Sequence, residues 1–408
     1  METHIAPTPA PGKGLGRDFG YLWSAGLIAP LGDGALVAAL PLAAKSLTDD
    51  PRLISGVAFA ATLPWLLLSV VGGALVDRMD RRRLMLGAQI TQAALVALIA
   101  ILVTSGLTQI WMLFLLPFGV ASAEVLFTTA GQTVIAAVVP EEHLEKANGR
   151  LVATETVAKE FAGPPLGAAL FAFATPLPFW LNSVTFALSV LLTARIRIPA
   201  REPRPATGEK LSAEIAAGLR WLLRHRLLRT LSLVAGAAMF CEAMALSTLV
   251  LFAHDELHIG DRGYGVLLAA MAVGGVVGGI IGGRVVGRLG GRVTAIGAQS
   301  ACSLMWLAIG LVGRSPVTVV ALFTVFSVSV SLWVVVVQSV RQRLVPGELL
   351  GRVSGAARML TWGAMPLGAL VGGFVADSFG LVSPWLVGGT LSLLVTLIAL
   401  PALLRWDR

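Results

Sequence analysis

Twelve long apolar runs constrain this chain more than any other feature. Each holds about 20 residues or more, the length at which an α-helix crosses roughly 30 Å of hydrocarbon. Their expected limits are 20–43, 54–76, 84–104, 109–138, 150–173, 177–195, 229–253, 263–286, 293–313, 316–340, 353–376 and 381–404. A content of 56% hydrophobic and 13% charged residues also differs from that of soluble domains. The sequence predicts an all-α membrane protein with twelve transmembrane helices.

Other residue types narrow the class further. The 45 glycines are spread through the apolar runs, which favours closely packed helices. The first 16 residues are polar and rich in proline, so no cleavable signal peptide is expected. Cys241 and Cys302 fall inside spans, where packing is their expected role, and the five histidines lie in the tail or loops. We therefore expect no disulfide framework, no metal site and no cofactor.

The net charge is +8, and the distribution of the Lys and Arg residues along the chain indicates the membrane topology. Most Lys and Arg residues fall on one side of the twelve-span arrangement, and the opposite side holds only Lys45, Arg52, Arg262 and Arg314. Positive residues concentrate on the cytoplasmic side of membrane proteins, so both termini and the central loop are predicted to be cytoplasmic. This distribution argues against a nucleic-acid partner.

An internal echo indicates a duplicated chain. The segment 73–83, which reads GALVDRMDRRR, ends one apolar run, and the segment 283–292, which reads GRVVGRLGGR, ends another about 210 residues later. Two parallel six-helix halves around a midplane site form an established transporter plan. We therefore expect two pseudo-symmetric bundles at 1–194 and 229–408.

The interval 195–228 joins the two bundles as a cytoplasmic linker. Its second part, 211–228, has helical periodicity, with Leu219, Leu222 and Leu223 among several arginines. An amphipathic basic helix lying on the cytoplasmic face is expected. Its role is either that of a tether between the bundles or that of a specific lipid-binding or regulatory element.

The segment Gly73…Asp77-Arg78-x-Asp80-Arg81-Arg82 resembles the loop 2–3 signature of the major facilitator superfamily. Asp80 stands where that signature has glycine, a variant similar to the branch of enterobactin and macrolide exporters. Further similarity to this branch lies in Gly32-Asp33, in Gly218 to Leu222 and in Leu350-Gly351-Arg352. The resemblance covers about 18–404 and implies the twelve-helix fold of that superfamily.

The same resemblance implies a conformational latch between the halves. Its residues would be Gly73, Asp77, Arg78, Arg81 and Arg82, with the aspartate at a neighbouring helix end and the arginines on nearby carboxylates and carbonyls. A plainer interpretation remains open, because arginines at cytoplasmic helix ends are common topology signals.

Span five carries Gly163-Pro164-Pro165-Leu-Gly167, similar to the Gly-Pro-x-x-Gly core of antiporters in this family. Proline within a helix removes a hydrogen bond and introduces a kink. We expect the flanking glycines to permit close contact with the opposite half. An ordinary proline kink is the alternative.

Acids within the spans point to the mechanism. Asp33, Glu124 and Glu242 lie near the centres of spans one, four and seven, where an ionisable group costs at least ~2.5 kcal/mol. Burial raises the pKa of a carboxylate, which suits proton exchange near neutral pH. Glu155 and Glu160 in span five join this candidate set. A structural role remains open for each acid, and an i,i+4 ion pair between Glu155 and Lys159 is the plain alternative for Glu155.

These features predict a proton-coupled exporter of a hydrophobic or amphiphilic small molecule, such as a drug, an antibiotic or a siderophore-like compound. A facilitator or importer of a small metabolite, without proton antiport, is the alternative. No constellation of catalytic residues indicates an enzyme. The expected setting is the bacterial inner membrane, with the lipid bilayer, the substrate and protons as partners and a monomer as the working unit.

Overall fold

A computed structural model describes residues 16–139, 143–196 and 211–405. Within these ranges it leaves undescribed the side chains of 69–78, 81, 132–133, 136–137, 145–146, 211–217, 347–348 and 350–352. The described residues form helices and connecting turns, without a β-strand. The helices are α1 (Gly16–Lys45), α2 (Pro51–Arg78), α3 (Arg81–Ser105), α4 (Ile110–Val138), α5 (Leu144–Thr156), η2 (Val157–Ala162), α6 (Gly163–Phe173), α7 (Leu177–Ala194), α8 (Leu211–Arg224), α9 (Arg226–Leu246), α10 (Leu249–Leu251), η3 (Phe252–Glu256), α11 (Asp261–Leu289), α12 (Gly291–Val312), α13 (Pro316–Leu344), α14 (Gly347–Trp362), α15 (Ala364–Phe379) and α16 (Ser383–Leu404).

The expected spans appear as helices. Among the described residues, 11 segments are long and apolar enough to cross a membrane. The remaining expected span, 150–173, is the unbroken helical run of α5, η2 and α6. This run carries the charged residues Glu155, Lys159 and Glu160, so its mean hydropathy is lower than that of the 11 apolar segments. The all-helical membrane fold predicted from the apolar runs is confirmed.

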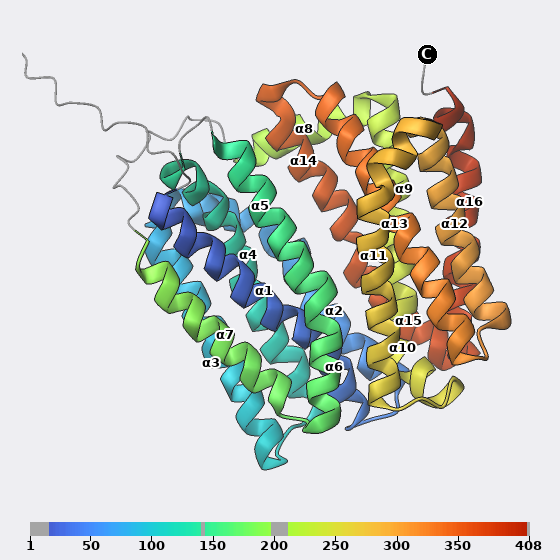
Figure 1. Ribbon diagram of the computed structural model, residues 1–408, viewed down its shortest axis with the longest axis horizontal. Helices are drawn as coiled ribbons and strands as arrows, with labels where there is room; N and C mark the ends of the chain where they lie inside the picture. The colour runs from blue at the N-terminus through green and yellow to red at the C-terminus, as the bar shows by residue number, and fades with distance from the viewer. Residues whose placement is uncertain (1–15, 140–142, 197–210, 406–408) are drawn as a thin grey trace, which may run out of the picture.

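The helices gather on two sides of the molecule (Figure 1). Those of residues 16–196, the N-terminal half, lie on the left, and those of residues 226–405, the C-terminal half, lie on the right. The halves meet where α2 packs on α15 and where α6 packs on α11. Small residues permit these approaches: a Cβ atom on Gly373 would collide with Ser55, and one on Gly265 would press on Ala168. Close helix packing at small residues is the usual way to hold helices together in lipid.

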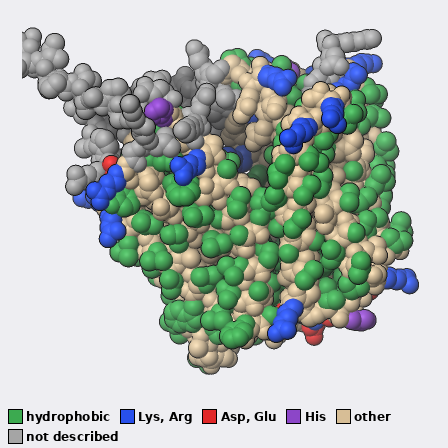
Figure 2. Space-filling view, viewed as in Figure 1, with side chains coloured by type: hydrophobic (Ala, Val, Ile, Leu, Met, Phe, Trp, Pro, Cys, Tyr) green, Lys and Arg blue, Asp and Glu red, His purple; other side chains and the backbone are tan. Residues whose placement is uncertain are grey.

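The two ends of the molecule differ. The end that carries α8 is here called the linker end, and the opposite end, where α1 stops at Lys45, the ion-pair end. Hydrophobic side chains cover most of the surface between the ends, and Lys and Arg gather near the ends, mainly the linker end (Figure 2). The same view shows a hollow between the halves near the linker end.

The expected amphipathic helix is α8, and it packs on protein. Leu222 is fully buried in a cluster with Leu228, Val353 and Ala357, because α8 lies against α14. Arg220 and Arg224 on α8 are exposed. The helix therefore docks its apolar side on the C-terminal half and turns basic residues outward.

Candidate functional site

A charged cluster lies inside the N-terminal half. Glu124 on α4 forms an ion pair with Lys159 on η2, and the two side chains are 19% and 25% exposed. Asp33 on α1 lies within electrostatic reach of both groups and beside Asn182 of α7. Four elements that are distant in sequence thus bring two of the predicted acids together around one lysine.

The π-helix η2 explains the position of this lysine. Pro164 and Pro165 open α6 and have no N–H, so the carbonyls four residues earlier lose their α-helical donors. The N–H of Gly163 instead donates to the carbonyl of Ala158, five residues back. The widened turn takes Lys159 to Glu124, and single π-turns inside helices often mark functional sites.

The ion pair expected between Glu155 and Lys159 is absent, and that prediction is wrong. The i,i+4 rule requires a regular α-helix between the two residues, but α5 ends at Thr156 and the π-turn begins immediately. Glu155 is exposed on α5 and lies within electrostatic reach of Lys159, Asp33 and Glu160. It borders the cluster without pairing.

The glycines of the Gly163-Pro164-Pro165-Leu-Gly167 element face their own half. A Cβ on Gly163 would collide with Gly34, and one on Gly167 would collide with the backbone of Ala35. Both neighbours belong to α1, so the expected contact of these glycines with the opposite half is wrong. The opposite half is met instead by Ala168, which lies against Gly265 of α11. The glycines seat α6 on α1, which holds Asp33 near η2.

Glu160 and Glu242 lie close to the boundary between the halves. Glu160 is on η2 and exposed, whereas Glu242 is half-buried on α9 and lines a small pocket of the C-terminal half. The two carboxylates lie within electrostatic reach of each other. Neither forms an ion pair within the described part of the chain.

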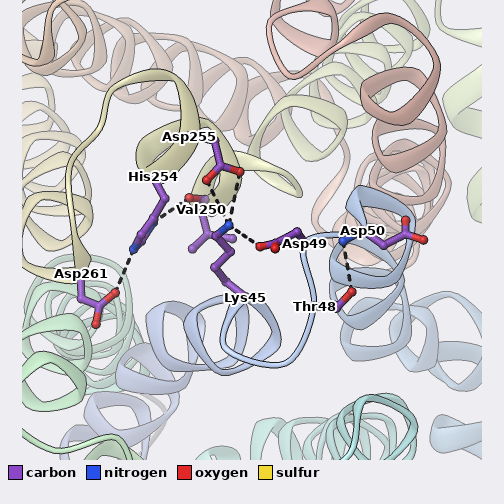
Figure 3. Close-up of polar contacts among 8 residues, drawn as sticks. All are labelled: Lys45, Thr48, Asp49, Asp50, Val250, His254, Asp255 and Asp261. Carbon is purple, nitrogen blue, oxygen red and sulfur yellow. Dashed lines mark hydrogen bonds and ion pairs between the residues drawn. The ribbon is translucent and has the colours of Figure 1, made fainter.

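Ion pairs join the two halves at the ion-pair end. The ammonium of Lys45 lies 2.5 Å from Asp49 and 3.0 Å from Asp255 of η3 (Figure 3). Arg52, at the start of α2, binds Asp50 at 2.9 Å and reaches Asp377 of α15 at 3.5 Å. These bonds close this end of the boundary, opposite the hollow.

A histidine supports the same end. Nε2 of His254 lies 3.0 Å from Oδ1 of Asp261, and Nδ1 lies 2.9 Å from the carbonyl of Val250 (Figure 3). This contact ties η3 to the start of α11 and so fixes the segment that carries Asp255.

The predicted latch is only partly described. The side chains of Gly73, Asp77, Arg78 and Arg81 lie outside the described residues. Arg82 donates to the backbone carbonyl of Ala194, which ties the start of α3 to the end of α7.

Asp80, the departure from the family signature, caps α3. Its Oδ1 accepts a hydrogen bond from the backbone N–H of Arg83 at 2.8 Å. An aspartate shortly before an apolar run is a recognisable N-cap signal, and it was available in the sequence, where Asp80 stands four positions before Leu84.

Sequence reasoning missed the pairs that cross between the halves. Lys45 and Asp255 are separated by 210 residues, and no local spacing links such groups. The available signal was that Lys45 and Arg52 are among the few basic residues on their side. Within 16–139, 143–196 and 211–405, no three His, Cys, Asp or Glu side chains lie together as a metal site would require.

The sequence matches the profile of the Major Facilitator Superfamily over residues 22–365 and 231–408. The chain belongs to this superfamily. It is 28% identical to the multidrug efflux pump Tap of Mycobacterium tuberculosis, with 93% of each chain covered. It is 24% identical to macrolide efflux protein A of Streptococcus pyogenes, with 93% of this chain and 94% of that one covered.

Among solved structures, a mutant of the nucleoside transporter NupG superposes with a TM-score of 0.75 at 12% identity. The match covers 95% of this chain and all of that one. The superfamily predicted from the loop 2–3 signature is confirmed, and so is the relationship to macrolide exporters. The protein is a multi-pass transporter of the bacterial cell membrane, with efflux pumps among its relatives, and it is not an enzyme.

Proposed function

We propose that this transporter exports a hydrophobic or amphiphilic small molecule in exchange for protons. The observation that carries the proposal is the cluster of Asp33, Glu124 and Lys159 inside the N-terminal half. Charged groups at membrane depth are costly and mark ion and proton pathways. Two carboxylates around one lysine can hold one negative charge in excess or, after taking up a proton, none. Such a cluster can exchange protons as access to it changes.

The direction of transport rests on the relatives and on charge. Lys and Arg gather at the linker end, which by the positive-inside rule faces the cytoplasm together with both termini. The ion-pair end then faces outward, where Lys45 and Arg52 hold the halves together. In this orientation the hollow opens to the cytoplasm, so the structure is the state that loads substrate from inside. Tap and macrolide efflux protein A are efflux proteins by name.

Alternating access follows from the same arrangement. The N-terminal and C-terminal halves rock against each other along the contacts of α2 with α15 and of α6 with α11. Glu155 and Glu160 lie next to the cluster and belong to the same set of acids. The latch residues Gly73, Asp77, Arg78, Arg81 and Arg82 act at the linker end when that end closes. One chain supplies both halves, so the working unit is a monomer.

Purified protein in liposomes tests the proposal. A pH gradient should drive accumulation of an amphiphilic substrate against its concentration gradient, and substrate should release protons from detergent-solubilised protein. Asp33→Asn and Glu124→Gln should abolish accumulation driven by the gradient and leave downhill exchange intact. The matched control is Glu256→Gln, because Glu256 is an exposed acid of η3 that forms no ion pair with the described residues. Full proton-driven transport by both the Asp33→Asn and the Glu124→Gln proteins would overturn the coupling assignment.

The alternative is a facilitator or importer. A facilitator equilibrates substrate and ignores the pH gradient, so the gradient experiment on the wild-type protein separates the two functions. Export is favoured because both named relatives above carry efflux in their names.

A further inference from the structure

The C-terminal half contains a pocket that the charged cluster of the N-terminal half does not use. It lies between α9, α12, α13 and α16. Its wall includes one acid, one amide and large apolar side chains: Glu242, Gln299, Met239, Trp306, Phe326 and Trp333. The pocket is small: its volume of about 40 Å³ has room for roughly three water-sized groups. A small head group fits there, and the remainder of a larger molecule would lie outside the pocket.

Glu242 is the only charged residue in this wall. Among the described residues it has neither an ion pair nor a hydrogen bond to its carboxylate. The amide of Gln299 donates to Ser392 at 3.2 Å and is engaged there. The like-charged Glu160 of the opposite half acts on Glu242 electrostatically. A half-buried carboxylate among apolar side chains thus has no counter-charge among the residues that the structure describes.

Glu124, an acid of the N-terminal half, differs from Glu242 because it has a partner of opposite charge. Glu124 pairs with Lys159, so the N-terminal half carries its own cation. The C-terminal half provides no lysine or arginine for Glu242 among its described residues. A cation from outside the chain can therefore pair with this carboxylate.

Aromatic residues define which cation would suit the pocket. Trp306 packs against Phe326 with ring centroids 4.1 Å apart and against Trp385 at 5.2 Å, so the rings of this wall support one another. Aromatic faces attract ammonium groups, and quaternary ammonium is recognised by aromatic cages. A metal ion would need several oxygen ligands, whereas this wall offers one carboxylate.

We propose that this pocket binds the ammonium head of an organic cation, with Glu242 as its counter-ion. The inference rests on the proposed export function and names the substrate class: amphiphiles with a small amine or quaternary ammonium group. Glu160 lies within electrostatic reach of Glu242, so its negative charge favours the same head group. Protons are then carried by Asp33 and Glu124, and the substrate charge is met by Glu242.

The test uses two probes of equal shape. One is 4-phenylbutyl-trimethylammonium, which cannot lose a proton, and the other is its uncharged analogue with a tert-butyl group in place of trimethylammonium. Calorimetry on the detergent-solubilised full-length protein at neutral pH measures both affinities. The wild-type protein should bind the cation about tenfold more tightly than the analogue.

Glu242→Gln should remove this preference by weakening the cation alone, and Glu242→Asp should keep most of it. The matched control, Glu256→Gln, should bind like the wild type. Equal binding of the two probes by the wild-type protein, or unchanged cation binding by Glu242→Gln, overturns the inference. Glu242→Asp retains the negative charge. If the Gln and Asp variants both lost the preference for the cation, that result would also count against Glu242 as the counter-ion.

Failure of this inference can be told apart from failure of the proposed function. If the preference for the cation is absent but a pH gradient still drives transport of an uncharged amphiphile, the subsite assignment alone is wrong. If the preference is present and no substrate responds to the gradient, the proton-coupling proposal alone is wrong.

Discussion

The ammonium of Lys45 lies 3.0 Å from Oδ1 of Asp255, a residue 210 positions later in the other half of the transporter. Among the residues that the structure describes, this pair and that of Arg52 with Asp377 are the two ionic links between the halves at the end opposite the hollow. Both links must break whenever that end opens. They therefore set part of the free-energy difference between the two access states.

Asp255→Asn should shift the protein towards the state that is open at the ion-pair end. The Asp255 side chain is 44% exposed, and ion pairs of this kind contribute about 0.2–1 kcal/mol, which corresponds to a 1.4- to 5-fold change in the ratio of states. Spin labels at Leu107 and Arg314, exposed positions at this end of the two halves, would report the change in distance distribution. Both native cysteines, Cys241 and Cys302, are buried, so a thiol-reactive spin label should react mainly with cysteines introduced at the two exposed positions. An identical shift in the control Glu256→Gln would refute the role of the pair.

Asp50 should give this end a measurable dependence on acid pH. Hydrogen bonds from the Arg52 side chain hold the pKa of Asp50 below its ordinary value of about 3.9. A depressed pKa stabilises the folded state above the unfolded-state pKa, and this stabilisation is lost as pH falls through the folded-state pKa. Asn caps helices as well as Asp, so Asp50→Asn removes the charge and keeps the cap that Asp50 makes on Arg52.

Thermal unfolding of the wild type and of Asp50→Asn between pH 6 and pH 3 checks this expectation. The wild type should be the more stable protein at pH 6, and the difference should begin to shrink as pH falls below about 4, the ordinary pKa of the carboxyl. A difference that stays constant over this range would show that the charge of Asp50 is not its source.

The sequence predicted the helices well because the bilayer leaves few choices. An apolar run of about 20 residues in lipid satisfies its backbone hydrogen bonds as a helix, so the limits of α1, α3 and α16 follow from hydropathy. The run α5–η2–α6 was found in the same way, since α6, which follows the charged residues, is apolar. The loop 2–3 signature then predicted the superfamily.

Which side chains of the candidate site pair with one another could not be predicted in the same way. Lys159 appeared to suit a local pair with Glu155 because the i,i+4 rule assumes an uninterrupted α-helix. Pro164 and Pro165 instead produce a π-turn just before them, and this turn moves the lysine to Glu124. Which helix α6 would face depended on tertiary packing, so its glycines were assigned to the wrong neighbour. The pairing of Lys45 with Asp255 depended on how the two halves close.

Gly167 should be intolerant of any side chain. A Cβ there would overlap the backbone of Ala35 on α1, and overpacking of this kind costs about 1–3 kcal/mol. Gly167→Ala should therefore lower the unfolding temperature. Gly279→Ala is the matched control, because Gly279 is an exposed helical glycine of α11 with no atom within 4 Å of the added Cβ. That control should be neutral or slightly stabilising, since alanine favours helix by about 1 kcal/mol. Equal effects of the two substitutions would argue against the close contact of α6 with α1.

The pairing of Lys159 with Glu124 predicts strong coupling in a double-mutant cycle. Lys159→Met leaves Glu124 without its cation and beside Asp33, so the single variant should be clearly destabilised. Glu124→Gln alone leaves the lysine without its main partner. The double variant removes both charges and should recover stability, with an interaction energy of about 1–3 kcal/mol.

Denaturant or thermal unfolding of the four proteins in one detergent measures this energy. Glu155→Gln paired with Lys159→Met forms a second cycle, in which the coupling should be much smaller because these two residues form no ion pair. If the Glu155 cycle gave the larger coupling, the π-turn would not direct Lys159 to α4 in the folded protein. The charged cluster would then belong to α5 and its neighbours alone, and the proton-exchange site would have to be sought among Glu155 and Glu160.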